Sequence, residues 1–358
     1  MAERTLFIAE AGVNHNGSLE LALKLVDAAA DAGADVVKFQ TFKADQLATA
    51  AAPKAGYQVA NTGDAGSQLE MLRRLELAPR DHEALLARCR ERGLRFMSTA
   101  FDAESLAFLA TLAMPAIKIP SGDITCGPLL LQAARLRQPL IVSTGMSTLG
   151  EIEAALGVIA FGLTRDDEPR GTADLDAAFA SAAGQAALRE RVTLLHCVTQ
   201  YPAPPHAVNL RAMATMAAAF DLPVGYSDHT LGIDVALAAV ALGATVIEKH
   251  FTLDRTMPGP DHQASLEPVE LARLVAGIRT IEAALGTSRK GPAPEEAANR
   301  QVARRSLVAA RPIKAGEPMT LASFACKRPG NGVSPMRIWD LVGRSATRDV
   351  GTDEPIDP

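Results

Sequence analysis

Short apolar runs rich in β-branched residues alternate along the chain with longer stretches in which apolar residues recur every three or four positions. The first pattern is typical of buried strands and the second of amphipathic helices. The expected strands are residues 6–10, 35–39, 94–98, 116–119, 140–143, 192–196, 223–226 and 245–248. Helical patterns occupy residues 19–32, 129–136, 149–161, 235–242 and 268–285. This repeated strand–helix alternation predicts an α/β fold, a (β/α)8 TIM barrel.

An open, doubly wound parallel sheet is the competing architecture. Such sheets usually carry a glycine-rich phosphate-binding turn after the first strand. Here that turn reads EAGVNHNG and does not match the fingerprint. The sequence therefore favours the closed barrel.

The chain divides into a barrel domain at residues 1–285, a linker at 286–304 and a second domain at 305–358. Glycine, proline and charged residues mark the linker, GTSRKGPAPEEAANR. The last segment has short strands between Pro and Gly turns, which predicts a small, mostly-β domain. Of two insertions, residues 43–80 follow the second strand, so they emerge on the C-terminal face and can shape a site there. Residues 164–190 precede a strand on the opposite face and are expected to be a flexible or helical surface excursion.

Composition narrows the classes of function. Hydrophobic residues make up 48% of the 358 positions, enough for a large core. The net charge of -5 comes from interspersed charges, which argues against nucleic-acid binding. No apolar run reaches the roughly 18 residues of a membrane span, and the N-terminus does not resemble a signal peptide. The four cysteines show no CxxC spacing, so reduced thiols and a cytoplasmic location are expected.

Polar residues stand at the C-terminal end of every predicted strand, where TIM barrels carry their active sites. A structural scaffold would not need this at all eight positions. The polar residues are Glu10, Asn14, His15, Lys38, Gln40, Ser98, Thr99, Lys118, Ser121, Ser143, Thr144, His196, Tyr201, Ser227, Asp228, His229, Glu248, Lys249 and His250.

Two lysines and several hydroxyls in this set suit an anion that carries both a phosphate and a carboxylate. The alternative is that the lysines are surface charges. The predicted anion-binding residues are Lys38, Lys118, Ser98, Thr99, Ser121, Ser143 and Ser227.

His229 and His250 close neighbouring strands, so their imidazoles can share one divalent metal ion. Glu10 is a candidate general acid or base, and its alternative role is a buried ion pair with Lys38. His15 and His196 are weaker metal candidates, and for His196 the alternative is a hydrogen-bonded role near the barrel mouth. His82 and His206 are expected at the surface.

An ordered series of motifs runs through nearly the whole chain: IAEAGVNHNG, VVKFQTFKAD, FMSTAFD, IKIPSGD, VSTGM, LLHCVTQYPAP, GYSDHTLG, IEKHFTLDR and GPDHQASLEP. In this order they resemble the bacterial sialic acid (N-acetylneuraminate) synthases. The tail, KRPGNGVSP, resembles the antifreeze-like (SAF) domain of these enzymes.

The resemblance implies an N-acetylneuraminate synthase that condenses phosphoenolpyruvate with N-acetylmannosamine and water, releasing phosphate. It implies that phosphoenolpyruvate binds to Lys38, Thr99, Lys118, Ser121, Ser143 and Ser227. Glu10 would be the catalytic carboxylate, with Lys38 and Lys118 stabilising the departing phosphate. His229 and His250 would bind a divalent metal, commonly Mn2+, with Mg2+ or Co2+ as alternatives. The sugar would face Gln40, Tyr201, Glu248 and Asp261.

The resemblance also implies a domain-exchanged homodimer, in which Arg328 of one subunit reaches the N-acetyl group of the sugar bound to the other. Thr199 and Gln200 lie in a stretch that varies within the family, which leaves the exact sugar open. A legionaminic acid synthase using 2,4-diacetamido-2,4,6-trideoxymannose is the nearest alternative. From other classes, a non-catalytic carbohydrate-binding protein and a Schiff-base aldolase acting on free pyruvate remain. The aldolase would need one desolvated lysine in place of a two-lysine anion site.

Overall fold

The computed structural model describes residues 4–63 and 66–357. The chain divides after Gly286 into two compact units, each with its own hydrophobic core. No helix in the described part of the chain is long and apolar enough to cross a membrane.

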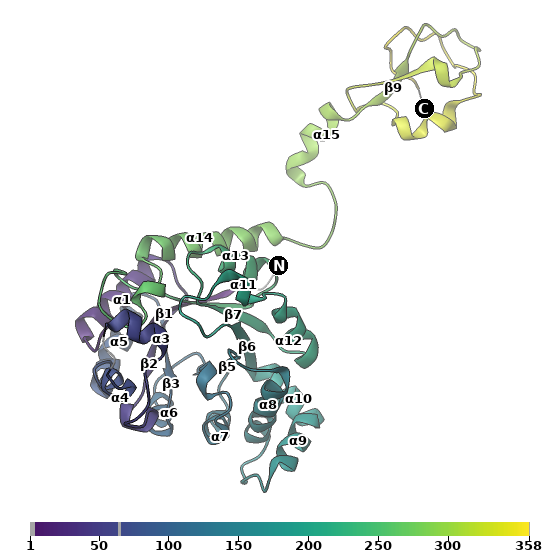
Figure 1. Ribbon diagram of the computed structural model, residues 1–358. Coiled ribbons are helices and arrows are strands. Elements are labelled where there is room, and N and C mark those ends of the chain that lie inside the picture. Colours follow the sequence, from purple (N-terminus) through teal and green to yellow (C-terminus); the bar gives the residue numbers. More distant parts are fainter. Residues whose placement is uncertain (1–3, 64–65, 358) are drawn as a thin grey trace. The chain divides into compact units, whose positions relative to one another are not determined.

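Eight parallel strands close into a barrel in chain order, β1 to β8, ringed by helices in Figure 1. This confirms the predicted fold. Five of the strands (β1, β2, β3, β7 and β8) extend two residues beyond their predicted ends, and in the last four of these the polar residues there belong to the strands themselves. The strands are β1 (Leu6–Gly12), β2 (Val36–Thr41), β3 (Arg95–Ala100), β4 (Ile117–Ile119), β5 (Leu140–Ser143), β6 (Val192–Cys197), β7 (Val224–Asp228) and β8 (Val246–His250).

The outer helices pack apolar faces against the strands. In α1 (Leu19–Asp31), for example, Leu25 and Val26 are fully buried, and the Ser18 hydroxyl caps the helix by accepting from the Leu21 N–H. The other helices around the strands are α5 (Pro79–Glu91), α6 (Ala103–Leu109), α7 (Gly127–Arg135), α8 (Leu149–Thr164), α11 (Pro205–Val208), α12 (Ala212–Phe220), α13 (Asp234–Ala241) and α14 (Pro268–Leu285).

Inside the barrel, one layer of apolar side chains forms a separate buried cluster: Ile8, Val36, Met97, Ala116, Ile141, Leu195 and Val246. Successive side chains of a strand point to opposite faces, so residues two positions further along point into the barrel as well. This apolar layer therefore lies directly below the next inward-facing layer, toward the strands' C-terminal ends.

Both insertions adopt helical structure. The first forms α2 (Ala44–Leu47), α3 (Gly56–Thr62) and α4 (Gln68–Arg73), while residues 64–65 of the predicted insertion lie outside the described residues. The second forms α9 (Thr172–Ala180) and α10 (Ala182–Arg191), which pack against α8. Of the two forms expected for this second insertion, flexible or helical, the structure shows the helical one.

The second unit contains one antiparallel pair, β9 (Ser306–Ala309) and β10 (Phe324–Lys327), with further isolated bridges. Its core comprises Leu307, Ala309, Ile313, Met319, Phe324, Leu341, Ala346, Val350 and Ile356. Short helices are α15 (Ala297–Ala303) and α16 (Ile338–Leu341). Every residue of α15, which lies within the predicted linker, is exposed.

Candidate active site

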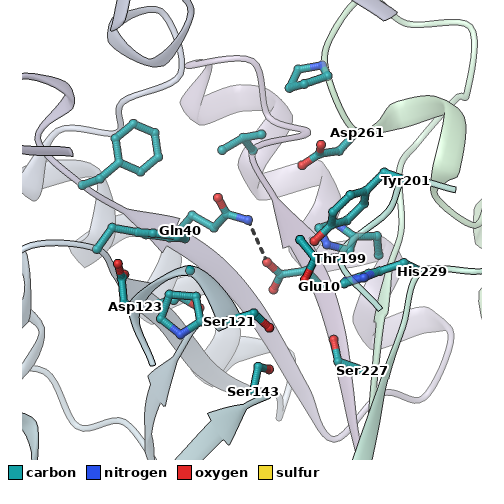
Figure 2. A pocket seen from close by; sticks show the side chains of 18 of the residues that line it. Glu10, Gln40, Ser121, Asp123, Ser143, Thr199, Tyr201, Ser227, His229 and Asp261 are labelled. Atoms are coloured by element: carbon teal, nitrogen blue, oxygen red, sulfur yellow. Dashed lines mark hydrogen bonds between the residues drawn. The ribbon is translucent and has the colours of Figure 1, made fainter. Parts of the chain in front are cut away.

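The polar residues lie two positions beyond the apolar layer, strand by strand. Ile8 is followed by Glu10, Val36 by Lys38, and Met97 by Thr99; Ala116, Ile141, Leu195 and Val246 are likewise followed by Lys118, Ser143, Cys197 and Glu248. These seven residues line one cavity of about 410 Å³. Figure 2 shows the labelled side chains around this cavity, with a hydrogen bond from Gln40 to Glu10.

Two lysines and two glutamates form a buried cluster at the base of the cavity. The Nζ atom of Lys38 lies 2.7 Å from Oε2 of Glu10 and 3.5 Å from Oε2 of Glu248. Lys118 Nζ lies 3.7 Å from Oε1 of Glu248. All four side chains are at most 6% exposed. The cluster is electrically balanced, which allows four charges to remain buried together.

Hydroxyl groups connect this cluster to the neighbouring strands. Lys38 donates to the Thr99 hydroxyl at 2.8 Å, and Lys118 donates to the Ser143 hydroxyl at 2.7 Å. Ser227 donates to Glu248 at 3.0 Å. The Ser121 oxygen lies 3.0 Å from Cys197 Sγ and accepts from the N–H of Gly145. Lys38 thus pairs with Glu10, the alternative role expected for that carboxylate, and also faces the cavity; its binding of an anion stays a prediction.

Neighbouring charges separate the pKa values of the two glutamates, which are equally buried. Desolvation raises the pKa of Glu10 to about 7 despite the opposing charge of Lys38. Glu248 is equally desolvated, yet the charges of Lys118 and Lys38 outweigh this effect and hold its pKa near 2. Desolvation lowers the pKa of Lys118, whereas for Lys38 the two carboxylates outweigh desolvation and raise its pKa. A carboxyl group near pKa 7 can both accept and release a proton at neutral pH.

His229 and His250 lie side by side on the cavity wall, with ring centroids 5.5 Å apart. Nδ1 of His229 lies 2.7 Å from the carbonyl oxygen of Val198, to which it donates, leaving Nε2 as the ring's lone-pair nitrogen. Nδ1 of His250 is buried and has no hydrogen-bond partner within the described residues. Burial lowers the pKa of both imidazoles, which favours the neutral form that binds metals. In the described ranges, no group of three or more His, Cys, Asp and Glu side chains is arranged to hold a metal ion.

The predicted sugar-facing residues Gln40, Tyr201, Glu248 and Asp261 also line the cavity. Tyr201 stacks on His229 with ring centroids 4.1 Å apart. Burial raises the pKa of Asp261 to about 6. Arg328 lies instead in the second unit, where its side chain is exposed and its Nε donates to the Ala303 carbonyl at 2.9 Å. Its role at a partner's sugar site stays a prediction.

Sequence reasoning missed several residues that line the cavity. Tyr57, Gln58 and Gln68 come from the first insertion, and the ring of Tyr57 lies 5.0 Å from that of Tyr201. Asp123 also lines the cavity and presents a buried oxygen without a hydrogen-bond partner among the described residues. The same holds for Thr199, which belongs to the variable stretch that the sequence analysis had singled out. The position of the insertion indicated that it could approach the site, but no residue pattern showed which side chains would do so.

Three other predicted polar residues, Ser98, Thr144 and His196, do not line the cavity. Ser98 precedes the inward-facing Thr99, so it points out of the barrel and bonds Thr41 at 2.7 Å. The Thr144 hydroxyl donates to the Leu195 carbonyl. His196 contacts the Val208 carbonyl at 2.6 Å, consistent with the predicted satisfied role.

His206 is exposed as expected, but the predicted surface position of His82 is wrong. His82 is fully buried on the inner face of α5, where its ring packs against Phe108 and its Nε2 lies 2.8 Å from the Thr41 hydroxyl.

The site is thus that of a TIM-barrel enzyme, with two lysines, two glutamates and a histidine pair at the C-terminal ends of the strands, where this fold carries its catalytic residues. The chain belongs to the NeuB family, whose model matches residues 25–290, and residues 304–358 match the SAF domain. It is 48% identical to the N,N'-diacetyllegionaminic acid synthase of Campylobacter jejuni over 98% of both chains. It is 45% identical to the enzyme of that name from Legionella pneumophila, over 94% of this chain and 88% of the relative.

A solved structure of similar fold is the N-acetylneuraminic acid (sialic acid) synthetase of Leptospira borgpetersenii in complex with citrate. Its TM-score is 0.67 at 32% sequence identity, and the match covers 83% of this chain and 90% of the other. The NeuB family, the barrel and the SAF domain expected from the sequence motifs are therefore confirmed.

Proposed function

We propose that the protein condenses phosphoenolpyruvate with the open-chain form of 2,4-diacetamido-2,4,6-trideoxymannose and water, giving N,N'-diacetyllegionaminate and phosphate. The high identity over nearly the whole chain to two N,N'-diacetyllegionaminic acid synthases supports this sugar over N-acetylmannosamine, the first expectation from the motifs. N-acetylneuraminate synthesis remains the second candidate, because the similar Leptospira structure carries that activity in its name.

The observation that carries the proposal is the balanced cluster of Lys38, Lys118, Glu10 and Glu248 at the base of the cavity. Phosphoenolpyruvate carries a phosphate ester and a carboxylate on the same carbon, C2. Two separate ammonium groups with hydroxyls beside them match this pair of anions better than one lysine would. A Schiff-base aldolase would not use the second lysine in this way.

In the proposed reaction, C3 of phosphoenolpyruvate forms a bond to the aldehyde carbon of the sugar, and water adds at C2. The C2–O bond to phosphate then breaks, and Lys38 and Lys118 stabilise the charge of the phosphate that leaves. Glu10 is the carboxyl group suited to hold the proton released by the added water, because it is buried beside Lys38 and Gln40. Ser143 and Thr99 orient the two ammonium groups.

His229 and His250 would hold a divalent cation, Mn2+ or alternatively Mg2+ or Co2+. The lone-pair nitrogen of His229 and the unpartnered Nδ1 of His250 fit this role. A bound cation would act as a Lewis acid on the aldehyde oxygen. With two imidazoles from the protein, other positions around the ion would be left to water and substrate.

The rim of the cavity supports a sugar with much apolar surface. Apolar side chains line it, several of them from the first insertion: Val13, Phe42, Leu47, Met71, Leu72, Leu75 and Phe101. The diacetamido trideoxy sugar has a methyl group at C6 and two acetyl methyl groups, whereas N-acetylmannosamine has a C6 hydroxyl and one acetyl group. Burying those extra methyl groups against this rim would favour the first sugar, by about 0.8 kcal/mol per buried CH2-sized group.

The test is phosphate release from phosphoenolpyruvate with each sugar in turn, in Mn2+ and again after EDTA treatment. We expect EDTA-sensitive turnover with a kcat/KM that is higher for the diacetamido sugar. A preference for N-acetylmannosamine would move the assignment to sialic acid synthesis. Release with neither sugar would count against the synthase proposal and favour the non-catalytic carbohydrate-binding alternative.

A further inference from the structure

A second buried ion pair lies behind the histidines, on the outer face of the barrel wall. Lys249 Nζ is 2.7 Å from Oδ2 of Asp228, and both side chains are fully buried. The two residues are register partners on β7 and β8. Asp228 directly precedes His229 and Lys249 directly precedes His250. Because side chains alternate along strands, this pair faces away from the cavity that the histidines line.

The ion pair holds the backbone on the far side of His229. Oδ1 of Asp228 accepts from the Thr230 backbone N–H at 2.9 Å and from the Thr230 hydroxyl at 2.8 Å. Lys249 also donates to the Thr230 carbonyl oxygen. Thr230 is therefore bound through its N–H, hydroxyl and carbonyl, and His229 lies between two residues fixed by the same pair. The Tyr226 hydroxyl adds a further bond to Asp228 at 3.1 Å.

Stability alone is a weak reason for this arrangement. Bringing two charges out of water is costly, and well-packed apolar residues at a buried ion pair often give equal or greater stability. What an apolar pair cannot do is hold the Thr230 backbone in one place relative to β8. Partners that hydrogen-bond to metal-binding histidines affect metal affinity by about 10–100-fold. A pair that fixes the backbone beside such a histidine acts on the same geometry without touching the ring.

We propose that Asp228 and Lys249 are positioning residues that set the separation of His229 and His250, and thereby the affinity of the site for a divalent cation. This inference rests on the metal-binding part of the proposed function. The pair couples the end of β7 to β8 through Thr230, so its removal lets the His229 backbone shift while both imidazoles remain.

The test compares Mn2+ binding to the full-length protein by titration calorimetry and by the EPR signal of free Mn2+. The informative variant is Asp228→Asn/Lys249→Met, which removes both charges and keeps an oxygen for the Thr230 N–H. Lys249→Met alone leaves a buried, unpaired carboxylate and is expected to be strongly destabilised. The double variant is expected to fold with an unfolding temperature close to that of the wild type but to bind Mn2+ about 10–100-fold more weakly.

A matched control removes an ion pair at the other end of the barrel. Arg279 lies 2.6 Å from Asp35, which directly precedes β2 at its N-terminal end. Arg279→Met is expected to lower the unfolding temperature and leave Mn2+ affinity unchanged. In the Asp228→Asn/Lys249→Met variant, saturating Mn2+ is expected to restore most of kcat.

Two outcomes would overturn the inference and are distinguishable. If the wild-type protein binds Mn2+ and the double variant binds within about twofold of it, the pair does not position the histidines and the proposed function stands. If the wild-type protein binds no Mn2+ at all, both the inference and the metal-binding part of the proposed function fail.

Discussion

Lys38 Nζ lies between the carboxylate of Glu10, at 2.7 Å, and the hydroxyl of Thr99, at 2.8 Å. The lysine proposed to bind the substrate anion is thus the charge partner of the proposed catalytic acid. Phosphoenolpyruvate bound as proposed would compete with Glu10 for Lys38. Added negative charge also favours protonation of Glu10, whose pKa is already raised to about 7 by burial.

Replacing this carboxyl group by an amide should abolish most of the turnover. In Glu10→Gln the side chain keeps its shape but can no longer exchange a proton. We expect kcat to fall by about 10²–10⁴-fold, measured as phosphate release, with the protein still folded by circular dichroism. Glu153→Gln, at an exposed position on α8, is the matched control and should retain full activity. Near-normal turnover of Glu10→Gln would remove Glu10 from the proton transfer.

Lys118 offers a test of anion binding that does not depend on turnover. Phosphoenolpyruvate should raise the unfolding temperature of the wild-type protein, because a ligand that binds the folded state stabilises it. In Lys118→Met the ammonium group that contacts Ser143 is gone, and we expect this stabilisation to disappear and kcat/KM to fall by about 10²–10³-fold. Equal stabilisation of wild type and variant would place the anion elsewhere.

Strand alternation explains how far sequence could predict this site. Lys38, Lys118, Glu248 and Ser143 were predictable because each follows an inward-facing apolar residue by two positions. Ser98 and Thr99 are adjacent, so alternation places only one of them in the cavity, and position at the strand end alone does not show which one. The helices of the first insertion bring Tyr57 to the cavity through tertiary packing, for which a single sequence carries no periodic signal.

The wrong prediction for His82, on an outer helix, has a similar cause: a single sequence does not show which residues the folded chain brings together. The burial of one histidine depends on which face of α5 meets the strands, and its two polar partners, Thr41 and the Ala78 carbonyl, become apparent only in the folded chain.

Two buried histidines next to the barrel mouth should make stability depend on pH. Burial lowers the pKa of His15 and of His262 to about 4, below the ordinary value of about 6.5. Between these values the unfolded chain takes up protons that the folded chain does not, so stability falls as the pH drops. The slope is at most about 1.4 kcal/mol per pH unit for each histidine.

The raised pKa values of Glu10, Asp123 and Asp261 act in the opposite direction, because those groups bind protons more readily in the folded state. The contribution of a histidine to the pH dependence of stability is therefore measured as a difference between its variant and the wild type. Urea unfolding at pH 7.5 and pH 5 should show a smaller pH-dependent loss of stability for His262→Gln than for the wild type. The exposed His206→Gln is the control, and identical pH dependence of His262→Gln and wild type would contradict the prediction.

Arg328 tests the expected exchange of SAF domains between subunits. We expect Arg328→Ala to raise KM for the sugar by about tenfold or more, since a lost charge-assisted hydrogen bond costs about 1.5–3 kcal/mol, and to leave KM for phosphoenolpyruvate nearly unchanged. Arg337→Ala, an exposed arginine of the same unit that pairs with Asp340, is the control.

The sharper experiment co-expresses Arg328→Ala with Glu10→Gln. If Arg328 acts on the partner's barrel, a mixed dimer contains one barrel with an intact Glu10 that receives an intact Arg328, and catalytic efficiency at low sugar concentration recovers above that of either variant alone. If Arg328 acts within its own chain, each barrel in the mixture lacks one of the two groups and no recovery occurs.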